Sequence, residues 1–301
     1  MLFWPSLWID KDFVRYCLEH EINFDTNLYY SPETEEYIQK HIDDRIRLAL
    51  RGYISRPMNR IEQDYDSLEK KMLKSTKKVS GFHKFTCENK SYYLAGEHFF
   101  PNLWIYHYGL KELPDAVKSY IAEKDFLDIG AFSGDSALMF LEYSPRRIFA
   151  YEPVLDNYNY LLQTIERNGL KDQIIPVNKG VGDKERTLKI DSKNGNSSFL
   201  PAYSDNKTEE VVVTTIDLEC KDKKIGIIKM DIEGFEYYAI EGALETIKRD
   251  KPVLLISIYH TGKDFFEIPP MIKKCVPEYK LKIVDAAPTS VHEKILVGYI
   301  E

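Results

Sequence analysis

The sequence is poor in cysteine, in positive charge and in long apolar runs, and each shortage excludes a class of protein. Its four cysteines are scattered and form no CxxC pair, which predicts free thiols in a reducing compartment and no structural zinc. The net charge of -7 argues against a broad basic face, so nucleic acid is not an expected partner. No apolar run approaches the roughly 20 residues that a membrane-spanning helix needs, so no transmembrane segment is expected.

The first residues, MLFWPSLWIDKDF, are aromatic but lack both a basic segment and a small-residue cleavage site. They therefore do not predict a secretory signal peptide, and a cytoplasmic location is expected. With 44% apolar and 30% charged residues, the composition is typical of a globular protein. A chain of 301 residues suits one large domain or two modest ones.

The sequence divides into two regions near residue 120. The first region, 1–120, predicts helices over about 31–53 and 59–79, because apolar residues recur there every three or four positions. Alternating residues over 82–95 predict a hairpin. This α-rich region differs in pattern from the second region, 121–301.

The second region alternates strand and helix patterns. Seven segments have strand character: 125–130, 147–151, 173–178, 225–230, 252–258, 279–284 and 295–300. Four segments between them have helical character: 135–143, 154–168, 235–249 and 266–275. This alternation predicts a parallel sheet with helices on both faces, interrupted by a β-rich stretch at about 186–215. The last two strands are too close in sequence for a parallel crossover, so they are expected to be antiparallel.

The stretch FLDIGAFSGDSALMF, residues 126–140, predicts a strand, a glycine turn from Gly130 to Gly134, and a helix. A second strand, RRIFAYEP, ends in Glu152 and Pro153, about 20 positions after the first glycine. This layout is typical of a site for a cofactor that carries adenosine. The glycines let the backbone approach the cofactor, and the carboxylate can accept hydrogen bonds from the two ribose hydroxyls.

The turn itself favours S-adenosyl-L-methionine over NAD. Phe132 and Ser133 would crowd a pyrophosphate, which needs bare backbone amides at a helix start. Asp128 before the turn and Asp135 after it bring negative charge to the same place. Negative charge repels a diphosphate but attracts an ammonium or sulfonium group. An ordinary strand, turn and helix with a solvated Asp is the simpler alternative.

Two further strands end in groups that can handle a proton. Asp231 and Glu233 follow the strand 225–230, and His260 follows the strand 252–258. The two carboxylates can orient a hydroxyl, accept its proton or hold a divalent ion, although capping of the next helix is an alternative for Glu233. An unperturbed histidine, with a pKa of about 6.5, suits a general base near neutrality. A structural role for His260 is the alternative.

A smaller loop, NKGVGD, follows the third strand. It contains Gly182 and Asp183, which either contact an adenine edge or simply form a turn.

Five motifs occur in order between about residues 124 and 300: LDIGAFSGD, AYEP, TIDL, KMDIEGFEYYAIEGA and ISIYH. Together they resemble the FkbM-type S-adenosylmethionine-dependent methyltransferases, and DIEGFE is the most diagnostic. Phe132 departs from the family, which usually has Asn there. The resemblance implies an α/β, Rossmann-like methyltransferase fold with seven mostly parallel strands and an antiparallel C-terminal pair. It also implies O-methylation of a glycan or small-molecule (natural-product) acceptor, with S-adenosyl-L-methionine as the methyl donor.

Roles follow for the residues at the ends of the strands. We expect a metal-free mechanism in which His260, Asp231 and Glu233 act on the acceptor. The expected cofactor contacts are Asp128, Gly130, Ala131, Phe132, Ser133, Gly134, Asp135, Glu152, Pro153, Gly182, Asp183 and Asp231. The first region, 1–120, is expected to serve acceptor recognition or homo-oligomerisation. An NAD-type oxidoreductase and a catalytically silent cofactor-binding partner protein remain as alternatives.

Overall fold

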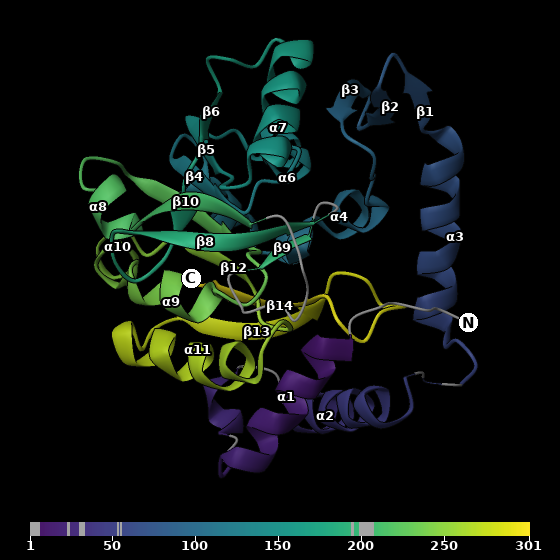
Figure 1. Cartoon of the computed structure of the whole chain (residues 1–301), viewed down its shortest axis with the longest axis vertical. Helices are drawn as coiled ribbons and strands as arrows, with labels where there is room; N and C mark the ends of the chain where they lie inside the picture. The colour runs from purple at the N-terminus through teal and green to yellow at the C-terminus, as the bar shows by residue number, and fades with distance from the viewer. Residues whose placement is uncertain are drawn as a thin grey trace.

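The computed structural model describes residues 7–22, 25–29, 34–52, 54, 56–193, 196–198 and 208–301. Its centre is a seven-stranded sheet with the order β13-β14-β12-β11-β4-β5-β6 (Figure 1). The strands are β4 (Asp125–Ile129), β5 (Arg147–Tyr151), β6 (Ile174–Val177), β11 (Ile225–Met230), β12 (Val253–Ser257), β13 (Lys280–Asp285) and β14 (Lys294–Tyr299). Six strands run in the same direction, and β14 alone runs in the opposite direction, between β12 and β13. The predicted fold class is confirmed.

The order of the strands reverses at the centre of the sheet. From β4 the chain moves outward through β5 to β6, and it then returns to β11 on the other side of β4. Ligands in open α/β sheets bind at the carboxyl ends of the strands where the order reverses in this way. The register pairs Met230 with Ile129, so the loops that leave β4 and β11 start side by side.

Helices cover both faces of this sheet. One hydrophobic cluster joins the sheet to α9 (Glu236–Glu241), α10 (Leu244–Asp250) and α11 (Gly262–Cys275). A second cluster joins its other face to α6 (Asp135–Phe140) and α7 (Leu155–Asn168). Among the described residues, no helix combines the length and apolarity needed to cross a membrane.

The predicted helix over 235–249 is divided in two. Gly242 ends α9 at a point where a Cβ would lie 2.1 Å from the carbonyl oxygen of Gly182, so the backbones meet there without room for a side chain. Helix α11 starts earlier than predicted, because Thr261 caps it by accepting a hydrogen bond from the Asp264 amide at 3.0 Å.

The described part of the predicted β-rich stretch forms a second sheet beside the first, whereas residues 194–195 and 199–207 of that prediction lie outside the described residues. Its strands are β7 (Gly180–Val181), β8 (Arg186–Lys193), β9 (Asn196–Ser198) and β10 (Thr208–Thr214), in the order β7-β10-β8-β9. The short helix α8 (Ile216–Glu219) follows β10 and leads back to the main sheet at β11.

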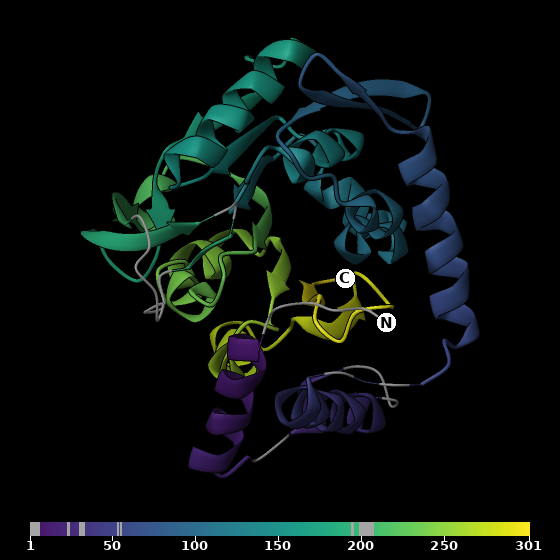
Figure 2. The same cartoon turned by 45° about the vertical axis from the view of Figure 1, so that its right-hand side comes forward.

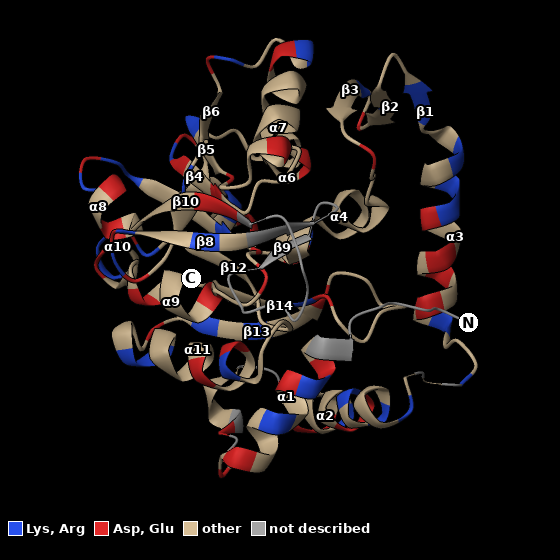
Figure 3. Ribbon diagram, in the orientation of Figure 1, with Lys and Arg blue, Asp and Glu red and all other residues tan. Residues whose placement is uncertain are grey.

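The N-terminal region begins with α1 (Leu7–Glu19), a short turn η1 (Thr26–Leu28), α2 (Thr34–Arg51) and α3 (Arg60–Ser75). Helix α3 ends before the predicted 79, because residues 77–79 form β1 (Lys77–Val79) and pair with the predicted hairpin of β2 (Phe82–Cys87) and β3 (Lys90–Ala95). Figures 1 and 2 show α3 along one side of the molecule, between the α1–α2 pair and this small sheet. Acidic and basic residues are interspersed along α3 (Figure 3).

The end of the N-terminal region packs into the core of the main sheet. It consists of α4 (Pro101–Tyr106), η2 (His107–Glu112) and α5 (Asp115–Ile121). The buried Trp104 and Leu110 belong to the same hydrophobic cluster as Phe126 of β4 and Val297 of β14. The two sequence regions therefore share a core.

A buried arginine joins the N-terminal helices to the end of β12. Arg45 of α2 is fully buried and donates hydrogen bonds to the carbonyls of Tyr259 at 2.7 Å and Ile9 at 2.9 Å. Its Nε lies 2.6 Å from Asp10 Oδ1, and the same carboxylate oxygen contacts His292 Nε2 at 2.9 Å. These contacts compensate the buried guanidinium, which would otherwise cost several kcal/mol.

Candidate functional site

The loops that follow β4, β5 and β11 are held together by backbone hydrogen bonds. Gly130 and Ala131 both donate to the carbonyl of Tyr151, at 3.0 and 2.9 Å, and Asp231 donates to Ile129 at 3.1 Å. The residues predicted from three separate motifs therefore lie on one edge of the sheet.

Both glycines of the first turn are required by its geometry. Gly130 has φ +79°, and a Cβ there would lie 2.0 Å from the carbonyl oxygen of Asp231. Gly134 has φ +92°, and a Cβ there would lie 2.8 Å from Leu161 Cδ1. Between them, Ala131 and Ser133 are buried, and the Ser133 hydroxyl has no hydrogen-bond partner among the described residues. The turn thus packs closely against its surroundings and keeps a polar group unused.

Glu152 supports this turn from the end of β5. Its side chain accepts hydrogen bonds from the amides of Phe132 and Val154, each at 2.9 Å, and the residue is only 4% exposed. Burial raises the pKa of Glu152 to about 7, although the two amides act in the opposite direction. The neighbouring Pro153 is half-buried, and its carbonyl accepts a hydrogen bond from Asn178 at 3.1 Å.

Asp128 forms a buried ion pair with Lys229, a residue that the sequence analysis missed. Asp128 Oδ1 lies 3.1 Å from Lys229 Nζ, and its other oxygen accepts a hydrogen bond from Ser136 at 2.7 Å. Lys229 also donates to the carbonyl of Gly130 at 2.7 Å. Burial works to lower the pKa of Lys229, but Asp128 and other nearby carboxylates raise it above its ordinary value. The signal in the sequence was a lysine within the otherwise apolar strand IGIIKM.

Asp135 is the second carboxylate that was predicted to face a cation. It is half-buried, and its Oδ1 accepts a hydrogen bond from the Ser136 amide at 2.8 Å. In the described part of the chain it has no ion-pair partner. Burial raises the pKa of Asp135 to about 6, while Lys229 acts in the opposite direction. Asp135, unlike Asp128, therefore has no ion-paired lysine or arginine among the described residues.

His260 lies among the carboxylates that follow β11. Its Nδ1 is 2.9 Å from Glu236 Oε1, and its Nε2 is 3.6 Å from Asp231 Oδ1 and 3.7 Å from Glu233 Oε2. Glu236 also accepts hydrogen bonds from the amides of Ile232 at 2.7 Å and Gly234 at 2.8 Å. Glu236 therefore fixes the loop that carries Asp231 and Glu233.

These carboxylates change the acid–base properties of His260. Burial alone would lower its pKa, but Glu236, Glu233 and Asp231 raise it to about 10. An unperturbed histidine was expected from the sequence, and the structure corrects this, because the neighbouring carboxylates favour the charged form of His260. Burial also raises the pKa of Glu233 to about 7, so this half-buried carboxyl titrates near neutrality.

Three more residues at this edge were not singled out from the sequence. Tyr259 donates a hydrogen bond to Asp231 Oδ1 at 3.4 Å. Burial and the neighbouring Asp231 raise the pKa of Glu293, which precedes β14, to about 7. Tyr108 of η2 lies near the same acids, since burial and then Asp231 raise its pKa well above the usual value. Tyr108 lies outside all of the motifs, so the sequence does not indicate that it is near these acids.

Gly182 and Asp183 are held by contacts within the protein. The Gly182 amide donates to the carbonyl of Thr214 at 2.9 Å, and a Cβ at this glycine would lie 2.8 Å from the ring of Phe235. Asp183 forms an ion pair with Arg186 at 2.7 Å. A contact of this loop with adenine stays a prediction.

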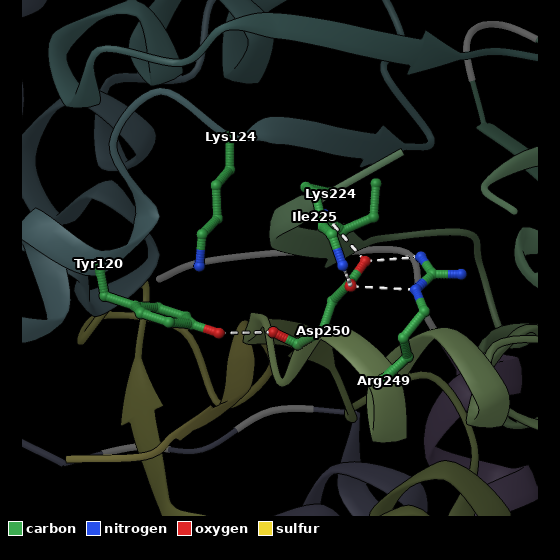
Figure 4. Close-up of a pocket in the computed structure, with 6 residues that line it drawn as sticks. All are labelled: Tyr120, Lys124, Lys224, Ile225, Arg249 and Asp250. Carbon is green, nitrogen blue, oxygen red and sulfur yellow. Dashed lines mark hydrogen bonds and ion pairs between the residues drawn. The ribbon is translucent and has the colours of Figure 1, made fainter. Parts of the chain in front are cut away.

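A pocket of about 190 Å³ lies at the opposite, amino ends of β4 and β11. Figure 4 shows Asp250 at its centre, with ion pairs to Arg249 at 2.6 Å and Lys224 at 3.6 Å. The Tyr120 hydroxyl donates to the Asp250 carbonyl at 2.7 Å. These groups are paired with one another, so the pocket serves the structure of this end of the sheet.

Comparison with known proteins identifies the family. The model of the methyltransferase FkbM domain matches residues 128–279, which is half of the chain. The chain belongs to the FkbM methyltransferase family. This confirms the resemblance seen in the motifs, and the matched segment is a methyltransferase FkbM domain.

Solved structures with similar folds include three methyltransferases. The methyltransferase FkbM from Methylobacillus flagellatus KT is 25% identical, with a TM-score of 0.49 over 60% of this chain and 44% of that chain. An rRNA methylase from Streptococcus thermophilus is 10% identical, with a TM-score of 0.41 over 68% and 100%. A Pyrococcus abyssi tRNA (uracil-54, C5)-methyltransferase in complex with S-adenosyl-L-homocysteine is 12% identical, with a TM-score of 0.42 over 74% and 45%. Among curated proteins, none matches the chain.

Proposed function

We propose that this methyltransferase transfers a methyl group from S-adenosyl-L-methionine to a hydroxyl group of a glycan or small-molecule acceptor. The observation that carries the proposal is the meeting of two groups of residues at one edge of the sheet. The glycine turn supported by Glu152 follows β4, and the acidic cluster around His260 follows β11 and β12.

The residues at the turn fit a cofactor with a cationic amino-acid end. Asp135 has no ion-pair partner among the described residues, and Ser133 has a buried hydroxyl without a hydrogen-bond partner there. Asp135 suits an ammonium group, and Glu152 suits the ribose hydroxyls. The other predicted contacts, including Gly182 and Asp183, are part of this proposal. When bound, the cofactor supplies an electrophilic methyl group on a sulfonium.

Glu233 is the side chain that we assign to proton removal from the acceptor hydroxyl. A general base works best when its pKa lies near the working pH, and the pKa of Glu233 is about 7. His260, as an imidazolium, orients Asp231 and Glu233 and balances their charge, with Nε2 3.6 and 3.7 Å from their oxygens. Asp231 then positions the hydroxyl. Residues 1–120 contribute acceptor recognition, for which Tyr108 is the candidate.

Calorimetry with S-adenosyl-L-methionine and with NADH tests the choice of cofactor. The wild-type protein should bind S-adenosyl-L-methionine. Glu152→Ala should weaken this binding by about 1.5–3 kcal/mol, because it removes hydrogen bonds to a charged group. Asp156→Ala is a matched control, since Asp156 is an exposed acid close by in the chain. Binding of NADH but not of S-adenosyl-L-methionine would support an oxidoreductase instead.

Methyl transfer to a panel of glycans and hydroxylated metabolites tests the reaction. Products should be methyl ethers, and Glu233→Gln should slow the transfer step by about 10²–10⁴-fold, the usual effect of losing a general base. Cofactor affinity should remain almost unchanged. Cofactor binding without transfer to any acceptor would favour the silent partner protein.

Asp231, Glu236 and His260 offer ligand atoms within 4.8 Å of one another, so a chelator must accompany this assay. Activity that EDTA abolishes and Mg²⁺ restores would overturn the metal-free mechanism.

A further inference from the structure

A second cluster of metal-binding side chains lies outside the acidic cluster and the glycine turn. It contains Cys87 at the end of β2, His107 at the start of η2, and Glu142 in the short helix η3 (Leu141–Tyr143) that follows α6. One ligand atom from each side chain lies within 4.8 Å of the other two. The three residues come from separate elements, so no spacing in the sequence reveals them.

His107 supplies an unused donor atom to this cluster. Its side chain is 1% exposed, and its Nε2 has no hydrogen-bond partner among the described residues. This atom lies 3.8 Å from Glu142 Oε2, whose companion oxygen Oε1 is also buried and without a partner.

The other ring nitrogen of His107 is already held. Its Nδ1 lies 2.8 Å from the hydroxyl of Tyr143. Histidines that bind metals usually have their second nitrogen in such a hydrogen bond, because the bond fixes the orientation of the ring. With Nδ1 engaged in this way, Nε2 points toward Glu142 and Cys87.

The donor atoms select the class of metal. Thiolate, imidazole and carboxylate together suit Zn²⁺ and similar ions, whereas Ca²⁺ and Mg²⁺ prefer oxygen ligands alone. Bonds of about 2.0–2.3 Å to zinc would draw the three atoms slightly closer together. Three protein ligands leave a fourth, tetrahedral position for water.

Charge also favours a divalent cation. Once a metal has displaced the Cys87 proton, the thiolate and the Glu142 carboxylate together carry two negative charges, which Zn²⁺ would neutralise within a half-buried site. Without a metal, burial raises the pKa of the Cys87 thiol to about 11. Glu88 adds negative potential, and Lys111 and Lys90 oppose it. Lys111 is directed to backbone carbonyls, because its Nζ donates to Trp104 and Ile105 at 3.1 Å each.

We propose that Cys87, His107 and Glu142 bind one zinc-class divalent ion, which connects the β2–β3 hairpin, the α4–η2 junction and the end of α6. As the sulfur–metal bond forms, the Cys87 thiol loses its proton to solvent. The proposal differs from the expectation, drawn from the spacing of the cysteines, that the chain holds no structural zinc. It does not depend on the proposed transfer reaction.

Cobalt is the probe for this site, because a thiolate bound to Co²⁺ gives a charge-transfer band in the near ultraviolet. The full-length protein, stripped with a chelator, should develop this band with one equivalent of Co²⁺ and lose it when Zn²⁺ is added. Cys87→Ser should abolish the band. Cys275→Ser, which removes another half-buried thiol, and His260→Gln, which disrupts the other metal-compatible cluster, should both retain it.

Two further variants protect the test if Cys87→Ser fails to fold. Tyr143→Phe removes the partner of His107 Nδ1 and should weaken Zn²⁺ affinity about 10–100-fold, the usual effect of losing such a partner. Glu142→Gln should weaken it at least as much. Zn²⁺ should also raise the unfolding temperature of the wild type, because a ligand that binds only the folded state stabilises it. No thiolate band in the wild type, or a band that survives Cys87→Ser, would overturn the proposal.

Discussion

Gly130→Ala tests the close packing at the centre of the site. The substitution places a Cβ 2.0 Å from the Asp231 carbonyl oxygen and 3.0 Å from Ile232 Cγ2, on a backbone with φ +79°. The left-handed conformation costs roughly 1–2 kcal/mol for a residue with a side chain. Displacing the packed neighbours adds about 1–3 kcal/mol. The free energy of unfolding should therefore fall by about 2–5 kcal/mol.

Gly81→Ala is the matched control for this prediction. Gly81 has a similar φ of +85°, but a Cβ there would meet no atom within 4 Å. The free energy of unfolding of Gly81→Ala should fall only by the cost of the left-handed backbone conformation, roughly 1–2 kcal/mol. Urea unfolding of both variants measures the difference. Equal losses in the two variants would refute the argument that the contact with Asp231 requires a glycine. At temperatures where both are folded, only Gly130→Ala should lose methyl transfer, because it displaces Asp231.

Three other predictions concern buried charges. Lys229→Met leaves Asp128 without its ion-pair partner, so the free energy of unfolding measured in urea should fall by about 3–5 kcal/mol. Adding Asp128→Asn should restore much of this loss. A double variant that is no more stable than Lys229→Met would contradict the prediction. The folded pKa of His260, about 10, exceeds the ordinary 6.5, so its stabilisation is complete below pH 6.5 and is lost as pH rises through 10. Wild type should lose stability over this range while His260→Gln should not, and parallel curves would disprove the assignment. The wild-type transfer rate should fall below pH 7 as Glu233 is protonated, and this dependence should be absent in Glu233→Gln.

Much of the main sheet could be predicted from the sequence, because its strands are buried on both faces. Strands of this kind are nearly continuous apolar runs, such as LLIS and IGII, and glycines or charged residues mark their ends. The edge where the ligand residues gather followed from the general rule for parallel sheets. The division of the helix at Gly242 could not be predicted, since the cause is a backbone 60 residues away at Gly182.

The charge states of the site residues could not be predicted from the sequence either, because they depend on contacts between distant segments. Lys229 neutralises Asp128 only because the register of β11 on β4 pairs these two positions. The pKa of His260 depends on three carboxylates from the loop after β11 and the start of α9, and no sequence motif gives their distances from the imidazole. Residue types and their order along the chain predicted that the ends of β4, β5, β11 and β12 meet, but not that Lys229 and Glu293 lie among them. The protonation state of each group depends on which side chains pack around it in the folded chain.

The contacts of Arg45 have a consequence for how the protein is made. Arg45 binds the Tyr259 carbonyl 214 residues later in the chain, and Asp10 contacts His292, which is 282 residues after it. Closing such long loops carries an entropy cost, and contacts distant in sequence slow folding. During translation helices α1 and α2 must therefore wait for partners that are synthesised more than 200 residues after them. Until then Arg45 and Asp10 stay hydrated, and the segment after β12 that carries His260 takes its final position only when these contacts form.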